Sequence, residues 1–465
     1  MKSGTGVRDV KVWWRPVDRS AAASRLMVLS AVSLLLLLLS TVAIADDWPQ
    51  WNGPERNGEW KESGILESIP ADGLKVLWRA DVAGGYSGPA VADGKVVVTD
   101  FLKQSGDSAN DPDKRNELVG EERVHCFDAA TGKLLWQVAE PCEYKISYPA
   151  GPRTTPAIDG GRVYTLGAEG RLQALNLADG KVVWKRELKT DYGIEAPIWG
   201  FCGHPLIDGD RLICLVGGPG SVVVAFNKHT GEEIWRALEA KEPGYSPPVM
   251  ISTPSGPQLV VWHSESIQGL DPATGKVYWS KPLKPNYGMA IMGPRQSGDL
   301  LFASGIGSVG ALFKLAADGR DAEVVWEGQK ETAIYCGNST PILQDGVIYG
   351  SDCQMGNFRA VDLATGKRLW ETFVLTTGGN RRESSGTAFL TRQGDRYWIF
   401  TEKGDLVLVR LSAEKFEELG RAHVIDPTAE AFGRSVAWTY PAFANRAMFV
   451  RNDKELICVS LAAQP

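Results

Sequence analysis

Residues 127–136 read Phe-Asp-Ala-Ala-Thr-Gly-Lys-Leu-Leu-Trp, and the chain uses variants of this stretch repeatedly. The oxygen of an Asp or Asn side chain accepts the backbone N–H two or three residues on, and Gly adopts the left-handed conformation, so the centre of the stretch predicts a tight turn. Trp136 begins the outgoing segment, where a large ring can pack between neighbouring sheets. The stretch therefore predicts two short strands joined by a turn.

Further copies of the stretch follow along the chain. They span residues 175–184, 226–235, 270–279 and 361–370, and a stretched copy spans residues 315–326. Seven tryptophans thereby fall in register as structural repeat positions: Trp78, Trp136, Trp184, Trp235, Trp279, Trp326 and Trp370. Neighbouring members of this series are 44 to 58 residues apart. A period of this size is typical of propeller blades.

A second periodic marker gives the number of repeats. Each unit opens with a small or polar residue followed, in all but one case, by Pro, and it continues as short strands with helical periodicity almost absent. The eight starts are Gly88-Pro89, Thr155-Pro156, His204-Pro205, Ser246-Pro247, Gly293-Pro294, Thr340-Pro341, Gly386-Thr387 and Tyr440-Pro441. These units predict an all-β chain in which residues 74–461 form an eight-bladed β-propeller. Residues 74–78 form a lone N-terminal strand, which should close the last blade beside residues 456–461 and remove a free edge.

The Asp-x-x-Thr-Gly-Lys-x-x-Trp pattern of residues 128–136 resembles the pyrroloquinoline-quinone (PQQ) repeat of quinoprotein dehydrogenase propellers. The resemblance covers about residues 74–461. Residues 48–54, 148–153 and 199–201 are also similar to a family of exported PQQ-like propeller proteins abundant in planctomycete bacteria. The same blade motif occurs in the propeller lipoprotein of the outer-membrane β-barrel assembly machine. Such a resemblance implies the fold, while function has to be argued from sites.

The first 45 residues have the pattern of an export signal. Six Lys or Arg precede and flank an uncharged apolar run over residues 26–44, and Ala43-Ile44-Ala45 is a small-x-small cleavage site. An uncleaved membrane anchor is the alternative, because about 19 apolar residues can just span a bilayer. No Cys occurs before Cys126, so a lipoprotein anchor is not expected. The sequence thus predicts a signal at 1–45, an N-terminal extension at 46–73 and a C-terminal tail at 462–465, in a protein of the periplasm or cell envelope.

Charge and composition exclude several classes of function. The net charge of the chain is −6, and because the first 45 residues carry +4, the remainder carries −10. An acidic chain lacks the basic surface on which nucleic-acid binding depends. None of the five His share a metal-ligand spacing, and no phosphate-binding loop, dinucleotide fingerprint or nucleophile elbow is present. We therefore assign no catalytic residue and no metal ligand.

Seven Cys follow the predicted signal, in a compartment where disulfides form. An odd number leaves at least one thiol unpaired. Cys336 and Cys353 fall in two connections of the same face of one blade, and we predict a disulfide between them.

The resemblance to quinoprotein dehydrogenases implies PQQ, Ca²⁺ and a catalytic Asp. Those enzymes commonly carry a vicinal Cys pair against the quinone, and no Cys-Cys occurs here. No cofactor is therefore expected, with PQQ and Ca²⁺ as the alternative.

The loops that enter the innermost strands share one face of a propeller and supply the candidate ligand-binding residues. These are Tyr148, Arg153, Trp199, Tyr245, Arg295, Arg434 and Trp438. Arg153, Arg295 and Arg434 come from the second, fifth and eighth repeats, and we expect them to converge on the axis and to favour a small anionic ligand. The alternative is that each Arg pairs with a loop carboxylate and each aromatic ring caps a blade. For His204 a packed, hydrogen-bonded role is expected.

Residues 103–122 interrupt the first repeat with a polar stretch and predict a mobile surface loop.

Taken together, the sequence favours a non-enzymatic scaffold or binding module that engages envelope proteins through its loops or strand edges. The resemblance implies that this role includes outer-membrane protein assembly. A PQQ-dependent oxidoreductase acting on an alcohol or sugar is the alternative.

Overall fold

The computed structural model describes residues 1, 4, 6, 8–13, 46–379 and 381–463. Most of the predicted export signal, including its apolar run and its cleavage site, lies outside the described residues. Contacts between Cα atoms divide the chain into residues 1–45 and 46–465, and the second unit contains every strand of the described residues. No helix among the described residues is long and apolar enough to cross a membrane.

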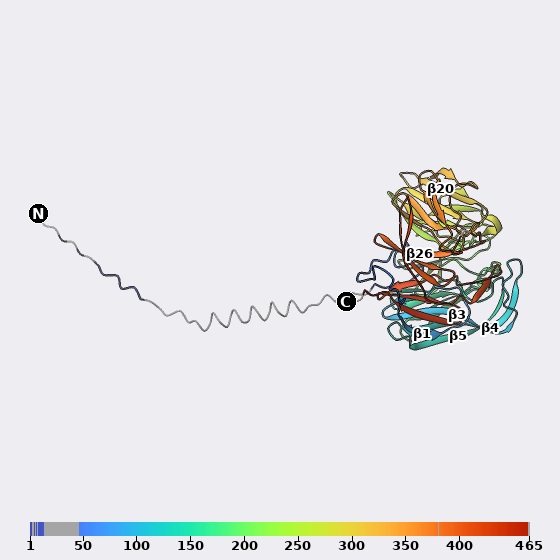
Figure 1. Ribbon diagram of the computed structural model, residues 1–465, viewed down its shortest axis with the longest axis horizontal. Helices are drawn as coiled ribbons and strands as arrows, with labels where there is room; N and C mark the ends of the chain where they lie inside the picture. The colour runs from blue at the N-terminus through green and yellow to red at the C-terminus, as the bar shows by residue number, and fades with distance from the viewer. Residues whose placement is uncertain (2–3, 5, 7, 14–45, 380, 464–465) are drawn as a thin grey trace. The chain divides into compact units, whose positions relative to one another are not determined.

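Short apolar runs rich in β-branched residues form strands that are buried on both faces. Val96, Val97 and Val98 in the first repeat are completely buried, and Leu212, Ile213 and Cys214 repeat this arrangement in the third. Side chains alternate between the two faces of a strand, so burial of successive residues means that both faces of the sheet are covered. Sheets packed face to face around one another meet this condition, and the folded unit is a β-propeller (Figure 1).

The described residues contain eight four-stranded antiparallel sheets, which we number 1 to 8. Sheet 1 consists of β2 (Ala90–Ala92), β3 (Lys95–Gly106), β4 (Asn116–Asp128) and β5 (Leu134–Ile146), and sheet 2 of β6 (Ala157–Asp159), β7 (Arg162–Leu166), β8 (Arg171–Asn176) and β9 (Val182–Glu187). Sheet 3 consists of β10 (Leu206–Asp208), β11 (Arg211–Leu215), β12 (Val223–Asn227) and β13 (Glu233–Ala237), and sheet 4 of β14 (Val249–Thr253), β15 (Gly256–Trp262), β16 (Ser266–Leu270) and β17 (Val277–Pro282).

Sheet 5 consists of β18 (Arg295–Ser297), β19 (Leu300–Gly305), β20 (Val309–Leu315) and β21 (Ala322–Glu327), and sheet 6 of β22 (Ile342–Gln344), β23 (Val347–Ser351), β24 (Phe358–Asp362) and β25 (Arg368–Thr372). Sheet 7 consists of β26 (Ala388–Gln393), β27 (Arg396–Thr401), β28 (Asp405–Leu411) and β29 (Phe416–His423), and sheet 8 of β32 (Ala442–Ala444), β33 (Ala447–Arg451), β34 (Glu455–Ser460) and β1 (Val76–Asp81). A hairpin of β30 (Ala429–Ala431) and β31 (Arg434–Val436), the short helix α2 (Leu188–Tyr192) and the 3-10 turn η1 (Asn286–Gly288) lie in the connections.

The N-terminal strand belongs to the last sheet, as the sequence predicts. β1 pairs with β34 in antiparallel register, with Trp78 opposite Cys458. A strand from the start of the chain therefore completes a sheet made by its end. β34 has a partner on both sides, which removes an open edge at that position.

The repeat tryptophans connect one sheet to the next. The Nε1 groups of Trp78, Trp136, Trp184, Trp235, Trp326 and Trp370 each donate a hydrogen bond to a backbone carbonyl in the turn of the following sheet, at 2.8–3.1 Å. Trp78 in sheet 8 donates to Ala129 in sheet 1, so this series also joins the last sheet to the first. Trp279 precedes the stretched repeat and donates instead to Oε1 of Gln258, whose Nε2 donates to the carbonyl of Gly319.

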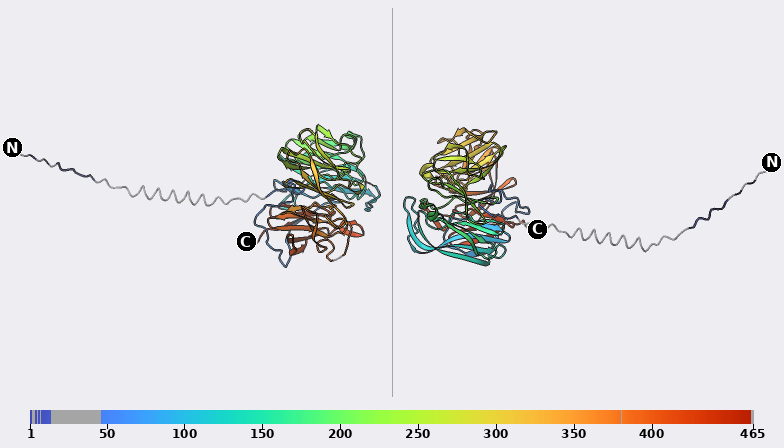
Figure 2. Two further views of the ribbon diagram at one scale, coloured as in Figure 1. Left: turned by 90° about the horizontal axis from the view of Figure 1, so that it is seen from above. Right: turned by 180° about the vertical axis from the view of Figure 1, so that it is seen from behind.

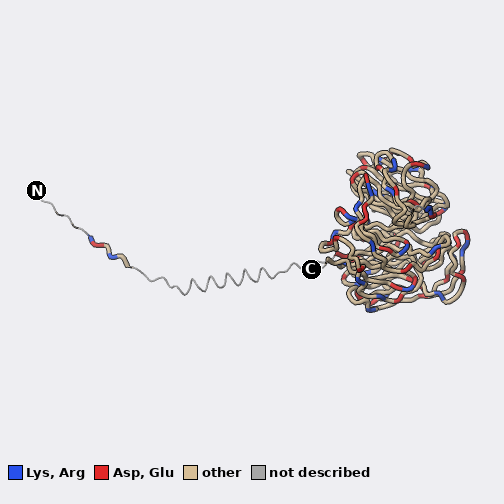
Figure 3. The backbone as a smooth tube through the Cα atoms, in the orientation of Figure 1, with Lys and Arg blue, Asp and Glu red and all other residues tan. Residues whose placement is uncertain are grey.

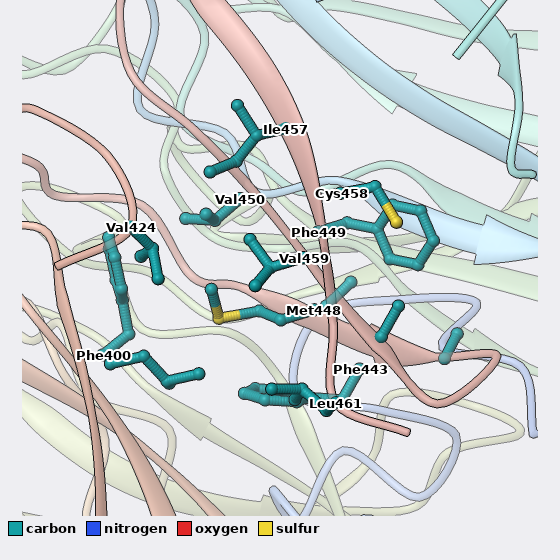
Figure 4. Close-up of a cluster of buried hydrophobic side chains, with 14 of the residues drawn as sticks. Phe400, Val424, Phe443, Met448, Phe449, Val450, Ile457, Cys458, Val459 and Leu461 are labelled. Carbon is teal, nitrogen blue, oxygen red and sulfur yellow. The ribbon is translucent and has the colours of Figure 1, made fainter. Parts of the chain in front are cut away.

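Hydrophobic clusters lie between all neighbouring sheets. One cluster joins sheets 1 and 2, another extends to sheet 3, and others join sheets 3 and 4, sheets 4 to 6, and sheets 6 and 7. The cluster drawn in Figure 4 combines Phe400 of sheet 7 with Phe443, Met448 and Phe449 of sheet 8, and it continues to Val96 of sheet 1. The inner strand β2 contacts both β6 and β32. The first sheet is thus packed against both the second and the last.

The N-terminal extension crosses the inner strands and closes the centre on one side. Trp48 pairs with Val91 of sheet 1, and the backbone of Trp60 bonds to Arg392 of sheet 7. Between them, the Arg56 guanidinium donates to the carbonyls of Pro205 and Pro248, at the entrances to sheets 3 and 4. Residues 48–60 therefore form a plug across the axis, which we call the axial plug. Figure 2 gives two further views of the unit.

Candidate functional site

A cavity of about 920 Å³ opens on the face that carries the connections between successive sheets. In a four-stranded antiparallel sheet, the connections to the neighbouring sheets lie on the same side as the turn between the second and third strands, and the other two hairpin turns lie on the opposite side. All the connections between sheets therefore meet on one face. Ten lining residues are aromatic: Trp51, Tyr86, Tyr148, Trp199, Tyr245, Tyr287, Phe389, Phe432, Trp438 and Tyr440. A concave, mainly apolar space with a few polar groups is the ordinary form of a ligand site.

The floor of the cavity is Trp51 of the axial plug. Its ring stacks on His204 with 5.0 Å between ring centroids, and Tyr440 meets it edge-on at 5.7 Å. Nδ1 of His204 accepts the backbone N–H of Thr155 at 2.9 Å, which places the ring proton on Nε2. Burial and the positive charge of Arg56 hold the pKa of His204 well below its ordinary value of 6.5. His204 is therefore neutral, packed and hydrogen-bonded, and it also lines the cavity.

Five of the seven predicted ligand-face residues line this one cavity: Tyr148, Arg153, Trp199, Tyr245 and Trp438. Tyr148 and Trp438 lie nearly parallel at 6.3 Å, and Trp199 meets Tyr245 edge-on at 5.5 Å. The structure thus brings residues from the second, third, fourth and eighth repeats together. Their rings offer stacking faces from opposite sides of one space.

The expected convergence of three arginines is wrong. The Arg434 guanidinium is paired with the buried Glu402 carboxylate, with Nε 2.9 Å from Oε1. Arg295 lies below the floor, where Nη1 donates to the backbone carbonyl of Arg56. Only Arg153 reaches the wall, and its guanidinium donates to the carbonyls of Ser147, Tyr148 and Gly151.

The charges of the lining balance one another. Arg153, Lys241 and Lys284 are matched in number by Asp113, Glu242 and Glu265. Acidic and basic residues are interspersed over the rest of the unit as well (Figure 3). The wall therefore creates no field of one sign, and the aromatic rings dominate its chemistry.

Buried carboxylates, which the sequence analysis does not identify, hold the loops of this face in place. Glu402 follows strand β27 and accepts hydrogen bonds from Nε1 of Trp438, from Arg434 and from the backbone N–H of Thr387. Burial raises the pKa of Glu402 despite these hydrogen bonds. Asp352 follows β23 at the corresponding place in sheet 6 and accepts from the backbone N–H groups of Tyr335, Gln354 and Met355. In the sequence, such carboxylates are indicated by an acidic residue directly after the buried second strand of a repeat.

The rim includes residues 103–122, which are not the loop that the sequence predicts. Residues 103–106 and 116–122 lengthen β3 and β4 into a hairpin that curves out of sheet 1, and a loop is confined to residues 107–115 at its tip (Figure 2). Its tip reaches the cavity: Pro112 and Asp113 line the wall, and Asn110 donates to the hydroxyl of Tyr86 and to the carbonyl of Glu430. The insertion is an ordered flap at the mouth.

The predicted disulfide is not present. All seven Cys are free thiols, and Cys336 and Cys353 belong to different hydrophobic clusters. Cys336 packs in the core shared by sheets 4 to 6, whereas Cys353 packs with Ala333 and Tyr335.

PQQ held by Ca²⁺ would require a set of oxygen ligands at the cavity. Calcium takes six to eight oxygen ligands, mainly from carboxylates and carbonyls. In the part of the chain that the structure describes, no three His, Cys, Asp or Glu side chains gather in a metal-binding arrangement. The aromatic walls could stack a planar ring, but the acidic donor set of a quinoprotein centre is not assembled.

Comparison with known proteins places the chain among PQQ-like propellers. A family model described as outer membrane protein assembly factor BamB matches residues 120–372 and 219–462. A BamB of Yersinia pestis is 24% identical over 267 residues, which cover 54% of this chain and 64% of the relative. A BamB of Salmonella typhimurium is 27% identical over 190 residues, which cover 39% and 38%. The chain thus spans less than two thirds of the length of these relatives.

Solved structures share the fold at low sequence identity. BamB from Moraxella catarrhalis superposes with a TM-score of 0.53 at 14% identity, covering 83% of this chain and 99% of that one. Quinohemoprotein alcohol dehydrogenase from Comamonas testosteroni gives a TM-score of 0.58 at 14% identity, covering 90% and 81%. One fold therefore carries an assembly factor and a dehydrogenase, and it does not by itself select between them.

Proposed function

The chain belongs to the family of PQQ-like propellers whose model is described as outer membrane protein assembly factor BamB, and from that membership we propose its function. It is an exported, non-enzymatic binding module of the periplasm or cell envelope that serves outer-membrane protein assembly. The aromatic cavity carries this proposal, because it offers a large apolar surface to a partner chain.

Eight blades in a closed ring are part of the proposal. Eight four-stranded sheets, hydrophobic clusters between neighbouring sheets and the bond from Trp78 to Ala129 support it. A closed ring fixes the loops that surround the cavity, because each blade is held by two neighbours. Residues 74–461 would then form the propeller, with residues 46–73 as its N-terminal extension.

The expected ligand is an extended peptide segment with aromatic and apolar side chains. The exposed rings of Tyr287 and Phe432, with 75% and 53% of their surface accessible, extend the apolar lining. Balanced charges around the wall would tolerate both acidic and basic residues of a partner. Strands of outer-membrane β-barrels alternate apolar and polar residues and carry aromatic residues near both membrane interfaces. An unfolded barrel protein in transit therefore has the chemistry that the cavity accepts.

The test is a binding titration with a labelled outer-membrane β-barrel protein, unfolded in urea and diluted into buffer. We expect saturable binding to the purified exported protein. Replacing Trp199 and Tyr245 together by Ala should weaken it about tenfold or more, since buried aromatic residues dominate such interfaces. The matched control is Val183→Ser on the exposed edge strand β9, which should bind like the wild type.

The enzymatic alternative is examined with the same preparation. PQQ and Ca²⁺ are added, the protein is passed through gel filtration, and its absorption spectrum is recorded. A quinone band that stays with the wild type and is lost on replacing Trp199 and Tyr245 would overturn the proposal in favour of an oxidoreductase. Absence of barrel-protein binding, or equal binding by the cavity variant, would also reject the proposed site.

A further inference from the structure

Three hydrogen-bond donors lie below the cavity floor without an acceptor. They are Nε1 of Trp51, Nε of Arg56 and Nη2 of Arg295, all completely buried. Tryptophan and arginine side chains carry donors and no acceptor, so these groups cannot satisfy one another. A buried donor left unpaired is costly, which makes three of them in one place a sign of an acceptor between them.

The three side chains form a single cluster. The guanidinium carbons of Arg56 and Arg295 lie 5.2 and 5.7 Å from the centroid of the Trp51 ring. Nη1 of Arg295 also donates to the backbone carbonyl of Arg56 at 2.6 Å. Their side chains are more than nine-tenths buried, with 7% and 9% of the residue surface exposed for the two arginines.

Two positive charges meet here with no opposite charge beside them. Among the described residues neither guanidinium forms an ion pair with a carboxylate. Burial lowers the pKa of Arg56 to about 9 and that of Arg295 to about 10, so both stay charged at neutral pH. The nearby thiols Cys214 and Cys336 have pKa values raised by burial and are neutral. Backbone carbonyl oxygens accept hydrogen bonds from the other guanidinium nitrogens, but these oxygens carry no negative charge that would balance the two arginines.

We propose that the axial plug holds a small inorganic anion of the halide type, bound by Trp51, Arg56 and Arg295. A buried water would accept the hydrogen bonds, but it would leave two adjacent positive charges uncompensated in a medium of low dielectric constant. An anion satisfies both requirements. It would also hold the N-terminal extension against the entrances to sheets 3 to 6.

The direct test is anomalous diffraction from wild-type crystals soaked in bromide. We expect a bromide peak within hydrogen-bonding distance of the three donors. A well-ordered site without anomalous signal, occupied by water, would overturn the proposal. This measurement needs no variant and is therefore independent of any folding defect.

The second test compares melting temperatures in sodium chloride and in sodium gluconate at equal ionic strength. At a hundredfold excess over its dissociation constant, chloride should raise the melting temperature of the wild type by about 3 °C relative to gluconate. Arg295→Met should abolish this difference. The matched control is Arg451→Met: Arg451 is as deeply buried, but all its guanidinium nitrogens donate to carbonyls, of Asn452, Thr99 and Ala83. Equal chloride effects in the wild type and Arg295→Met would reject the site.

Discussion

Five of the repeat turns place their glycine against the tryptophan of the preceding sheet. A Cβ built on Gly132, Gly180, Gly231 or Gly275 would come within 2.6–2.7 Å of the neighbouring indole ring, and all four have positive φ. The turn therefore requires glycine for two reasons, its left-handed backbone and the space occupied by the ring. The same turn supplies the carbonyl that accepts the indole N–H, so one short motif sets both the hairpin and the contact between sheets.

Two glycines separate these effects. Gly231 and Gly209 both have positive φ, but a Cβ on Gly231 meets the Trp184 ring at 2.7 Å, whereas nothing lies within 4 Å of one on Gly209. We expect Gly209→Ala to lower the free energy of unfolding by about 1 kcal/mol and Gly231→Ala by about 2–4 kcal/mol, because only the latter displaces a packed ring. Denaturant unfolding of the two variants measures the difference, and equal losses would contradict the packing role of Trp184.

Asp100 gives a prediction for the dependence of stability on pH. Burial alone would raise the pKa of Asp100, but the close contact of its Oδ2 with Nε2 of His125, at 3.0 Å, and the hydrogen bonds from Arg123 bring it well below its ordinary value of 3.8. A carboxyl with a lowered folded-state pKa stabilises the fold fully above 3.8 and loses this contribution as the pH falls further. Asp100→Asn should cost about 3–5 kcal/mol at pH 7. Its deficit relative to the wild type should shrink by about 1 kcal/mol at pH 3. Unfolding titrations at both pH values decide the matter, and a deficit that does not change would show that the carboxylate is not the titrating group.

Among the elements, the repeat pattern predicts the short hairpins well, but it does not predict the strands in the insertion. Residues 103–122 were expected to be a loop because their polar side chains show no apolar face. At the end of β3, Lys103, Gln104 and Ser105 are exposed, whereas Leu118 of β4 is buried in a cluster with Phe101. Backbone pairing and this one buried apolar contact maintain the strands, and a single buried Leu in a polar stretch is too weak a hydrophobic pattern to predict them.

Shortening this hairpin tests its role as a flap. Residues 107–115 would be replaced by a two-residue Asn-Gly turn, which removes the bonds of Asn110 to Tyr86 and Glu430. We expect the cavity to bind the apolar dye 8-anilinonaphthalene-1-sulfonate with at least twofold higher fluorescence, while the melting temperature changes by less than about 3 °C. Asn110→Ala, which keeps the hairpin, is the control. A large loss of thermal stability without extra dye binding would identify the hairpin as a structural brace.

For the whole molecule, the sequence predicts the repeats and the shared face of their connections, but not the content of the centre. Tyr148, Trp199 and Trp438 line one cavity because every connection between sheets opens on the same face. Arg295 was misplaced because it begins β18 and points below the floor, a difference of side-chain direction that position in a loop does not encode. The axial plug was missed because residues 48–60 have no repeat and acquire their structure only from the inner strands that they cross.

We propose that the cavity face, rather than the edges of the sheets, engages unfolded outer-membrane proteins. Site-specific photo-crosslinking tests it most directly, with p-benzoylphenylalanine placed at Phe432 on the cavity rim or at Val183 on the exposed edge strand β9. Each protein is mixed with a urea-unfolded outer-membrane β-barrel protein, diluted and irradiated. If the cavity face is the binding surface, we expect a crosslinked product from position 432 and none from position 183. A product from position 183 alone, or from neither position, would contradict it.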